Sequence, residues 1–182
     1  DRLRERRDDL VMVEITGSHD GTTAVDYTVN CAVGYPAITG HINDPRPVNH
    51  SLPAWDLICG QTAALGILAA DRHRFRTGEG QHVSLALADV ALAAVAWLGQ
   101  LAEAEVNGVD RQATGNDLYG AYGRDFATSD DRRVMVVAIT DRQWTALLAA
   151  TETAAAVGEI EDELGIDFGD EGARFTARDR LG

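Results

Sequence analysis

The chain has 182 residues and 45% of them are hydrophobic, so it can bury a core and does not read as a disordered segment. Its net charge of −13 argues against a nucleic-acid partner or an anionic membrane surface, because the field of the chain repels phosphate groups. All 16 basic side chains are arginine, and the absence of lysine excludes Schiff-base catalysis and a lysine-bearing phosphate loop.

The first 53 residues predict one strand and irregular structure around it. The opening DRLRERRDDL reads as the end of a helix, and the β-branched run at 10–17 predicts a buried strand closed by glycine. Residues 25–34, VDYTVNCAVG, fit either a short helix capped by Gly34 or a strand, and periodicity does not distinguish the two. The proline-rich stretch at 35–53 predicts an irregular loop.

A long helix over residues 54–76 is the clearest predicted element. Ser51 is the predicted N-cap, Pro53 suits the first turn, and Gly78 suits the position after the last turn. Leucines and isoleucines are spread around its circumference, which predicts that the helix is buried on more than one side. Arginines in the last turns complement the negative end of the helix dipole.

Two more elements precede a glycine-rich loop. Residues 80–89 alternate smaller or polar side chains with larger apolar ones, which predicts a strand. VALAAVAWLGQLAEAEVNG, residues 90–108, predicts one apolar helix that ends near Gly108. The loop at 110–123 follows.

The last third of the chain predicts a hairpin and then helices. RDFATSDDRRVMVVAIT, residues 124–140, predicts two strands joined by a turn at SDD. Residues 141–151 predict a helix capped by Asp141. The acidic segment GEIEDELG predicts a solvated helix face, and the closing EGARFTARDRLG reads as a helix just beginning.

A composition shift between residues 106 and 125 predicts two domains. We expect the end of a large domain over 1–108, a linker over 109–124 and the start of a smaller domain over 125–182. Because the chain opens on the end of one helix and closes on the start of another, we expect it to be a fragment. Its longest apolar run is too short to cross a bilayer, and its two cysteines, in no C-x-x-C pair, predict a reducing cytoplasm.

Asp56 is the leading catalytic candidate because it lies in the first turn of the long helix. Unpaired backbone N–H groups there favour an ionised carboxylate by about 0.3–1 kcal/mol. An ionised carboxylate can attack an activated acyl group and form a covalent intermediate. Acidic residues also occur in first turns simply because they complement the dipole, and spacing alone does not separate these interpretations.

The other candidates have ordinary structural explanations. Cys59 lies one turn after Asp56 and is expected in the core, as are the three tryptophans. GNDLYGAYG, residues 115–123, fits either a mobile cover over a ligand or a turn-rich linker. No group of residues has metal-ligand spacing, so we expect no metal and no permanently bound cofactor.

LPAWDLICGQTAALGILAADRHRFRTGEGQHVSLALAD resembles the family III CoA-transferases, the carnitine dehydratase and bile-acid-inducible group. That family carries an Asp-x-x-x-Gly element, here Asp56 to Gly60, ahead of a long helix, an arginine-rich end and a TG-GQ string. The resemblance covers nearly the whole chain. It implies an α/β fold with a Rossmann-like large domain and a smaller α/β domain, and two chains that interlock as a homodimer.

The resemblance also implies a mechanism with Asp56 as nucleophile. Asp56 would attack an acyl-CoA thioester to give a mixed anhydride, and the released thiolate would convert it into an aspartyl-CoA thioester. VNHSLPAWD and DRQATGNDLYGAYGRDF are similar to strings in members that move CoA from carbon-1 to carbon-4 of mesaconyl-CoA, a short unsaturated dicarboxylate thioester. Coenzyme A is then part of the substrate, and holding the acid between steps gives the advantage of proximity.

Further site residues follow from the same resemblance. His50 and Gln61 flank the nucleophile and are predicted to bind a substrate carboxylate or an anhydride oxygen. Asn116, Tyr119 and Gly120 are predicted to contact substrate, in the loop where some members carry a glycine-rich cover. Here other side chains interrupt the glycines of that loop.

One departure from a related branch bears on the reaction. The branch that racemises 2-methylacyl-CoA thioesters has a histidine directly before an aspartate, where this chain has Val25 before Asp26. Without the imidazole base, proton abstraction beside the thioester loses its partner, so transfer is favoured over racemisation. Two alternatives stay open: CoA transfer to a separate acyl acceptor, and a non-catalytic segment that only binds acyl-CoA or dimerises.

Overall fold

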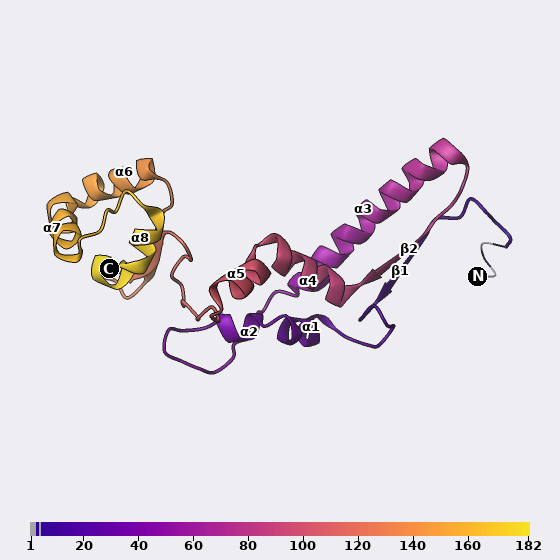
Figure 1. Ribbon diagram of the computed structural model, residues 1–182, viewed down its shortest axis with the longest axis horizontal. Coiled ribbons are helices and arrows are strands. Elements are labelled where there is room, and N and C mark those ends of the chain that lie inside the picture. The colour runs from indigo at the N-terminus through magenta and orange to yellow at the C-terminus, as the bar shows by residue number, and fades with distance from the viewer. Residues whose placement is uncertain (1–2, 4) are drawn as a thin grey trace. The chain divides into compact units, whose positions relative to one another are not determined.

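The computed structural model describes residue 3 and residues 5–182, which form two compact units (Figure 1). Unit 1 comprises the chain up to Thr39 together with Pro45–Gln112, and unit 2 comprises Gly40–Asp44 and Ala113–Gly182. Each unit has its own hydrophobic cluster of buried residues. The domain limits expected from the sequence, with a linker over 109–124, stay a prediction.

Unit 1 contains a parallel strand pair. Strand β1 (Met12–Thr16) lies beside β2 (His82–Ala86), with Val13 opposite Val83. Parallel neighbours need a long crossover connection, and here it is helical. Three helices form the crossover: α1 (Asp26–Ala32), α2 (Tyr35–Ile38) and α3 (Ala54–Thr77). Helix α3 packs along the strand pair (Figure 1).

The elements of unit 1 agree with the sequence in its strands and differ from it in two segments. Both strands are confirmed, and the segment 25–34 takes the helical alternative, as α1. The loop predicted at 35–53 holds the short helix α2, which has Pro36 in its first turn. The opening segment is wrong as a helix end for its described residues, which form turns rather than a helix; residues 1, 2 and 4 lie outside the described residues.

Helix α3 begins and ends close to the predicted limits. Gly78 closes it in the left-handed conformation at φ 80°, which glycine adopts without a Cβ penalty. The predicted N-cap at Ser51 is wrong, because the N-cap is Pro53, which offers no side-chain acceptor.

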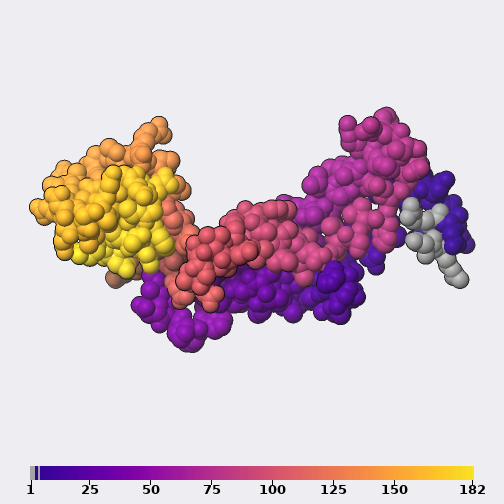
Figure 2. Space-filling view, viewed as in Figure 1, coloured from indigo at the N-terminus to yellow at the C-terminus, as the bar shows by residue number. Residues whose placement is uncertain are grey.

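The burial predicted for α3 is wrong for the described residues. Its buried residues form one stripe at helical spacing: Trp55, Cys59, Ala63 and Ala70. Leu57, Leu65 and Leu68 keep more than half of their surface exposed, and much of the helix is visible in the space-filling view (Figure 2). The apolar residues surround the helix as the sequence indicated, but the described elements of unit 1 cover only one side.

The single helix predicted over 90–108 is two helices, α4 (Leu87–Trp97) and α5 (Gln100–Asn107). The break lies at Gly99, which adopts φ 74°. Trp97, at the end of α4, is 77% exposed, so its predicted core position is wrong, whereas the other two tryptophans are buried. Among the described residues no single helix is long and apolar enough to span a membrane; α4 and α5 together pass by length and composition, with a 61° bend between them.

Gly80 marks a close backbone approach beside the sheet. Its N–H donates to the carbonyl oxygen of Asp8 at 2.9 Å, and a Cβ atom on Gly80 would lie 2.1 Å from the carbonyl oxygen of Leu10. We expect Gly80→Ala to lower the free energy of unfolding by about 2 kcal/mol or more, because backbone rather than a side chain must move. Gly60→Ala, in α3 with no atom within 4 Å of the new Cβ, should instead raise it by about 0.5–1 kcal/mol.

Urea denaturation of the two variants beside the unaltered protein measures both changes. Equal effects of the two substitutions would show that the close approach at Gly80 does not limit the strand pair.

The predicted hairpin is confirmed and lies in unit 2. Strand β3 (Tyr122–Ala127) pairs antiparallel with β4 (Arg133–Ala138), and Asp131 in the turn adopts φ 60°. Four helices follow: α6 (Asp141–Thr151), α7 (Ala154–Leu164), α8 (Glu171–Thr176) and α9 (Arg178–Leu181). Helix α7 contains the acidic segment and has one buried residue, Val157.

The predicted cap of α6 is wrong in its residue. The N-cap is Thr140, whose hydroxyl accepts from the N–H of Gln143 while the Gln143 side chain accepts from the N–H of Thr140, a capping box. Asp141 follows the cap and instead accepts from the guanidinium of Arg174 at 2.6 Å.

Arg174 lies completely buried in unit 2. Its guanidinium donates to the carbonyl oxygens of Phe168 at 2.5 Å and Gly169 at 3.1 Å, and lies 5.2 Å from the ring centroid of Trp144. A fourth donor contact reaches the carbonyl of Ile139 at 3.4 Å. Because a buried charge needs partners for all its donors, this residue ties the loop after α7 to the start of α6.

Candidate active site

Asp56 lies in the first turn of α3 with its side chain at the surface of unit 1. The residue before it, Trp55, points inward and is 5% exposed. The first turn therefore has one buried and one exposed side chain in succession. The carboxylate of Asp56 therefore faces outward, while the buried side chain of Trp55 holds the same turn against the core.

The same turn is also held by a second carboxylate, that of Asp26 in α1, which is 2% exposed. Its Oδ2 accepts from the backbone N–H of Trp55 at 2.8 Å and of Asp56 at 3.4 Å. Its Oδ1 lies 2.6 Å from Nε2 of His50. Since the N-cap Pro53 carries no acceptor, Asp26 supplies the cap of α3 from a distant part of the sequence.

Asn30 adds a second set of contacts one turn further along α1. It is 1% exposed, and its Oδ1 accepts from the indole Nε1–H of Trp55 at 3.1 Å. Its Nδ2 donates to Oδ1 of Asn49 at 2.8 Å. Residues four apart lie on the same face of a helix, so Asp26 and Asn30 face the start of α3 together.

Asp26 and Asn30 were not predicted as site residues. Two sequence signals point to them: both are polar at i and i+4 in α1, and Pro53 leaves the start of the next helix without a local acceptor.

Cys59 is buried in the core one turn after Asp56, as predicted. Burial raises the pKa of the Cys59 thiol above its ordinary value, and the charge of Asp56 raises it further. The thiol therefore stays protonated near neutral pH and does not compete with the carboxylate as a nucleophile.

The structure places the predicted substrate-binding residues in two groups. His50 contacts Asp26 and packs edge-on against Tyr27, with ring centroids 5.9 Å apart. Gln61 is exposed on α3. The other three lie in unit 2: Asn116, Tyr119 and Gly120.

The unit 2 residues have partners within that unit. The Arg133 guanidinium lowers the pKa of the Asp125 carboxyl, and the side chain of Asn116, hydrogen-bonded to the same carboxyl, lowers it further. Tyr119 packs on Phe175 with ring centroids 5.0 Å apart. Their role as substrate contacts stays a prediction.

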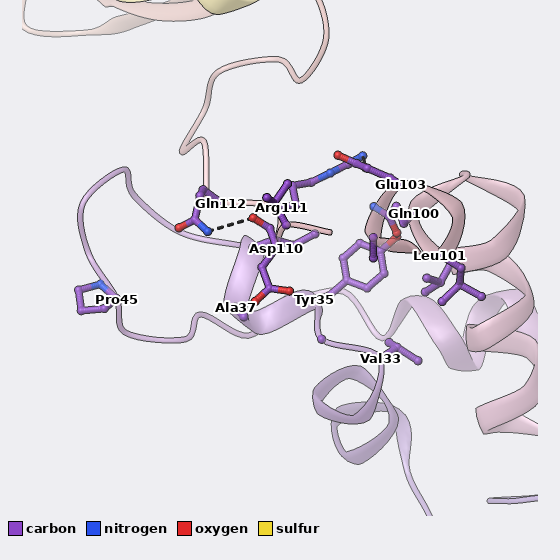
Figure 3. Close-up of a pocket in the computed structure, with 15 residues that line it drawn as sticks. Val33, Tyr35, Ala37, Pro45, Gln100, Leu101, Glu103, Asp110, Arg111 and Gln112 are labelled. Atoms are coloured by element: carbon purple, nitrogen blue, oxygen red, sulfur yellow. Dashed lines mark hydrogen bonds and ion pairs between the residues drawn. The ribbon is translucent and has the colours of Figure 1, made fainter. Parts of the chain in front are cut away.

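Unit 1 contains a cavity of about 620 Å³ between α2, α5 and the segment after α5 (Figure 3). The hydroxyl of Tyr35 donates to Oε1 of Gln100 at 2.9 Å, and Arg111 forms an ion pair with Glu103 in its lining. Asp56 does not line this cavity.

A smaller cavity of about 240 Å³ lies behind the start of α3, where His50 and Trp55 line it together with Asn30. Asp56 lies outside this cavity as well. Across residue 3 and residues 5–182, no group of three or more His, Cys, Asp or Glu side chains could hold a metal ion.

Comparison with known proteins gives a consistent result. The family model described as CoA-transferase family III matches residues 1–176. The chain is 51% identical over 181 residues to the 2-methylfumaryl-CoA isomerase of Chloroflexus aurantiacus, which covers 100% of this chain and 44% of that protein. It is 30% identical over 193 residues to the succinyl-CoA:mesaconate CoA-transferase of Haloarcula hispanica, covering 98% of this chain and 45% of that protein.

The solved structures agree in fold. A CAIB/BAIF family protein from Brucella suis superimposes with a TM-score of 0.70 at 23% identity, covering 98% of this chain and 46% of that one. The mixed α/β fold expected from the sequence is confirmed. The chain spans about half the length of the curated relatives it matches.

Proposed function

Because this chain belongs to CoA-transferase family III, we propose that its protein moves coenzyme A between the two carboxylates of a short unsaturated dicarboxylate. The proposed substrate is mesaconyl-CoA, also called 2-methylfumaryl-CoA, with transfer from carbon-1 to carbon-4. The 51% identity to a protein named 2-methylfumaryl-CoA isomerase supports this choice of substrate. The observation that carries the chemistry is the outward carboxylate of Asp56 on a turn fixed from within by Asp26.

The proposed reaction has four steps and no change in oxidation state. A carboxylate oxygen of Asp56 attacks the thioester carbon, the C–S bond breaks, and CoA leaves as thiolate from a mixed anhydride. The thiolate attacks the Asp56 carbonyl carbon, which frees the dicarboxylate and leaves an aspartyl-CoA thioester. The other carboxylate of the acid then attacks this thioester, its C–S bond breaks, and CoA leaves as thiolate from a second mixed anhydride. The thiolate attacks carbon-4 of this anhydride, which places CoA on carbon-4 and frees the carboxylate of Asp56.

The remaining expectations belong to the same proposal. Coenzyme A enters as part of the substrate. Gln61 and His50 flank Asp56 in the sequence and are proposed to bind a substrate carboxylate or an anhydride oxygen. Asn116, Tyr119 and Gly120 are proposed to contact substrate from unit 2. A homodimer in a reducing cytoplasm is proposed as well, and both described cysteines are free thiols.

A second candidate is transfer between separate molecules. It is favoured by the relatives from two Haloarcula species at 30% identity, both named succinyl-CoA:mesaconate CoA-transferase. Such an enzyme would release the first acid and accept another from solution.

An isotope-labelling experiment distinguishes transfer within one substrate molecule from transfer between molecules. The protein, expressed from its complete reading frame, is given unlabelled mesaconyl-CoA with an excess of ¹³C-labelled free mesaconate, and the product is analysed by mass spectrometry. We expect the carbon-4 thioester without label, because the acid stays in the site between steps. Label in the product would support transfer between molecules, and the absence of any thioester movement would contradict both and favour a binding or dimerising role.

A further inference from the structure

Helix α1 holds the first turn of α3 at two levels. At the first level Asp26 contacts His50 on one side and the amides of Trp55 and Asp56 on the other. At the second level Asn30 joins Asn49 to the same tryptophan. Each level therefore links α1, the loop before α3 and the start of α3.

The amides at the start of α3 depend on this contact. The first N–H groups of a helix have no partner within the helix, and an unsatisfied buried donor costs about 1–3 kcal/mol. The cap at Pro53 makes no side-chain hydrogen bond, so Oδ2 of Asp26 takes the role that a local Ser, Thr or Asp would have. The path of the backbone at the nucleophile is thus set by a tertiary contact.

His50 fixes the orientation of the Asp26 carboxylate. Nε2 of His50 lies 2.6 Å from Oδ1 of Asp26, and we assign the proton of this contact to Nε2, because the other oxygen of the carboxyl group accepts from two backbone amides. The imidazole is 22% exposed, and its ring centroid lies 5.9 Å from that of Tyr27 and 6.4 Å from that of Trp55. With Oδ1 held by His50, Oδ2 is left directed at the amides.

We propose that Asp26 and His50 are a positioning pair for the nucleophile Asp56, acting through the backbone of the first turn of α3. This inference rests on the proposed function, because it assigns a role in acyl transfer to Asp56. Covalent attack needs the reacting atoms about 3–3.5 Å apart and aligned, and a displacement of about 1 Å can cost 10²-fold in rate. The pair makes this alignment independent of the substrate.

The inference differs from a substrate-binding role for His50 in what it predicts. A residue that only positions the nucleophile changes kcat while KM stays the same, because such a residue does not touch the substrate. A residue that binds a substrate carboxylate raises KM when removed. The two roles also differ in whether a neutral donor can replace the imidazole.

The test compares His50→Ala with His50→Gln in the protein expressed from its complete reading frame. We expect His50→Ala to lower kcat for thioester movement by about 10- to 100-fold with KM unchanged. His50→Gln should recover most of that rate, because its amide N–H can donate to Asp26. His82→Ala is the matched control, since His82 also faces a carboxylate, Oε2 of Glu14 at 3.1 Å, but on the strand pair.

Asn49→Ala tests the second level without removing the histidine. Asn49 is exposed, so this variant should fold, and we expect a smaller loss of kcat with unchanged KM. If His50→Ala is recovered only unfolded, His50→Gln decides the question. A raised KM at unchanged kcat in His50→Gln would then overturn the inference.

Three further results would overturn it. They are a raised KM at unchanged kcat in His50→Ala, a His50→Gln variant as slow as His50→Ala, and an equal loss in His82→Ala. The unaltered protein is assayed first, so that a failure of the proposed function can be distinguished from a failure of the positioning role. Absence of turnover there contradicts the proposed function and the inference together, whereas normal turnover in every variant contradicts the inference alone.

Discussion

Replacing Asp56 with asparagine is expected to lower the rate of CoA transfer by at least about 10³-fold, because an amide cannot serve as the nucleophile. The side chains have nearly the same shape, and the backbone contact to Asp26 uses the N–H of residue 56 rather than its side chain. The fold of α3 and the binding of substrate should therefore persist. The loss should appear in kcat.

Two measurements check this expectation. Steady-state kinetics gives the rate, and hydroxylamine or borohydride treatment in the presence of thioester, followed by peptide mapping, locates the acylated residue. Asp71→Asn on the same helix is the control: Asp71 is paired with Arg74 at the exposed far end of α3, and its loss should leave the rate unchanged. An adduct on another residue, or undiminished transfer in Asp56→Asn, would contradict the mechanism.

Arg174→Met is expected to lower the free energy of unfolding of unit 2 by about 3 kcal/mol. Methionine fills much of the same space but leaves the carbonyl oxygens of Phe168, Gly169 and Ile139 without their donor. Most of the effect should come from these carbonyls. The ion pair with Asp141 adds less, because that carboxylate is 77% exposed and screened by water.

Hydrogen exchange of the β3–β4 amides, followed by mass spectrometry, reports on unit 2 separately from unit 1. Protection of these amides should fall strongly in Arg174→Met. Arg132→Met is the control, since Arg132 is 83% exposed and its ion pair with Asp130 lies at the surface. Equal loss of protection in both variants would show that burial of Arg174 contributes nothing specific.

The sequence predicted those parts of the fold that depend on local signals. The first strand follows from a β-branched run, the second from alternation, the hairpin from two strand-like runs around a polar turn, and the end of α3 from Gly78. The break in the second apolar helix at Gly99 was not predicted. The sequence does not show whether a single glycine inside an apolar run adopts a positive φ angle or continues the helix. The burial of α3 was wrong since periodicity shows where apolar residues lie and not what covers them.

In the candidate site, too, local sequence signals predicted one residue and missed another whose role depends on a tertiary contact. Asp56 could be proposed from its place in a first turn and from the resemblance to a family. Asp26 could not, because its role depends on a contact between residues 29 and 30 positions apart in the chain. The predicted cap at Ser51 was wrong for the related reason that a local rule was applied where the acceptor comes from another helix.

The capping of α3 by Asp26 has a consequence for ligand design. The amide end of a helix commonly attracts phosphates and carboxylates, but here a resident acid already occupies those groups. A dicarboxylate inhibitor aimed at this end would find the amides of Trp55 and Asp56 already paired with Asp26. Tight binders are therefore better built as neutral acyl mimics opposite Asp56, with their anionic groups directed to arginine side chains elsewhere.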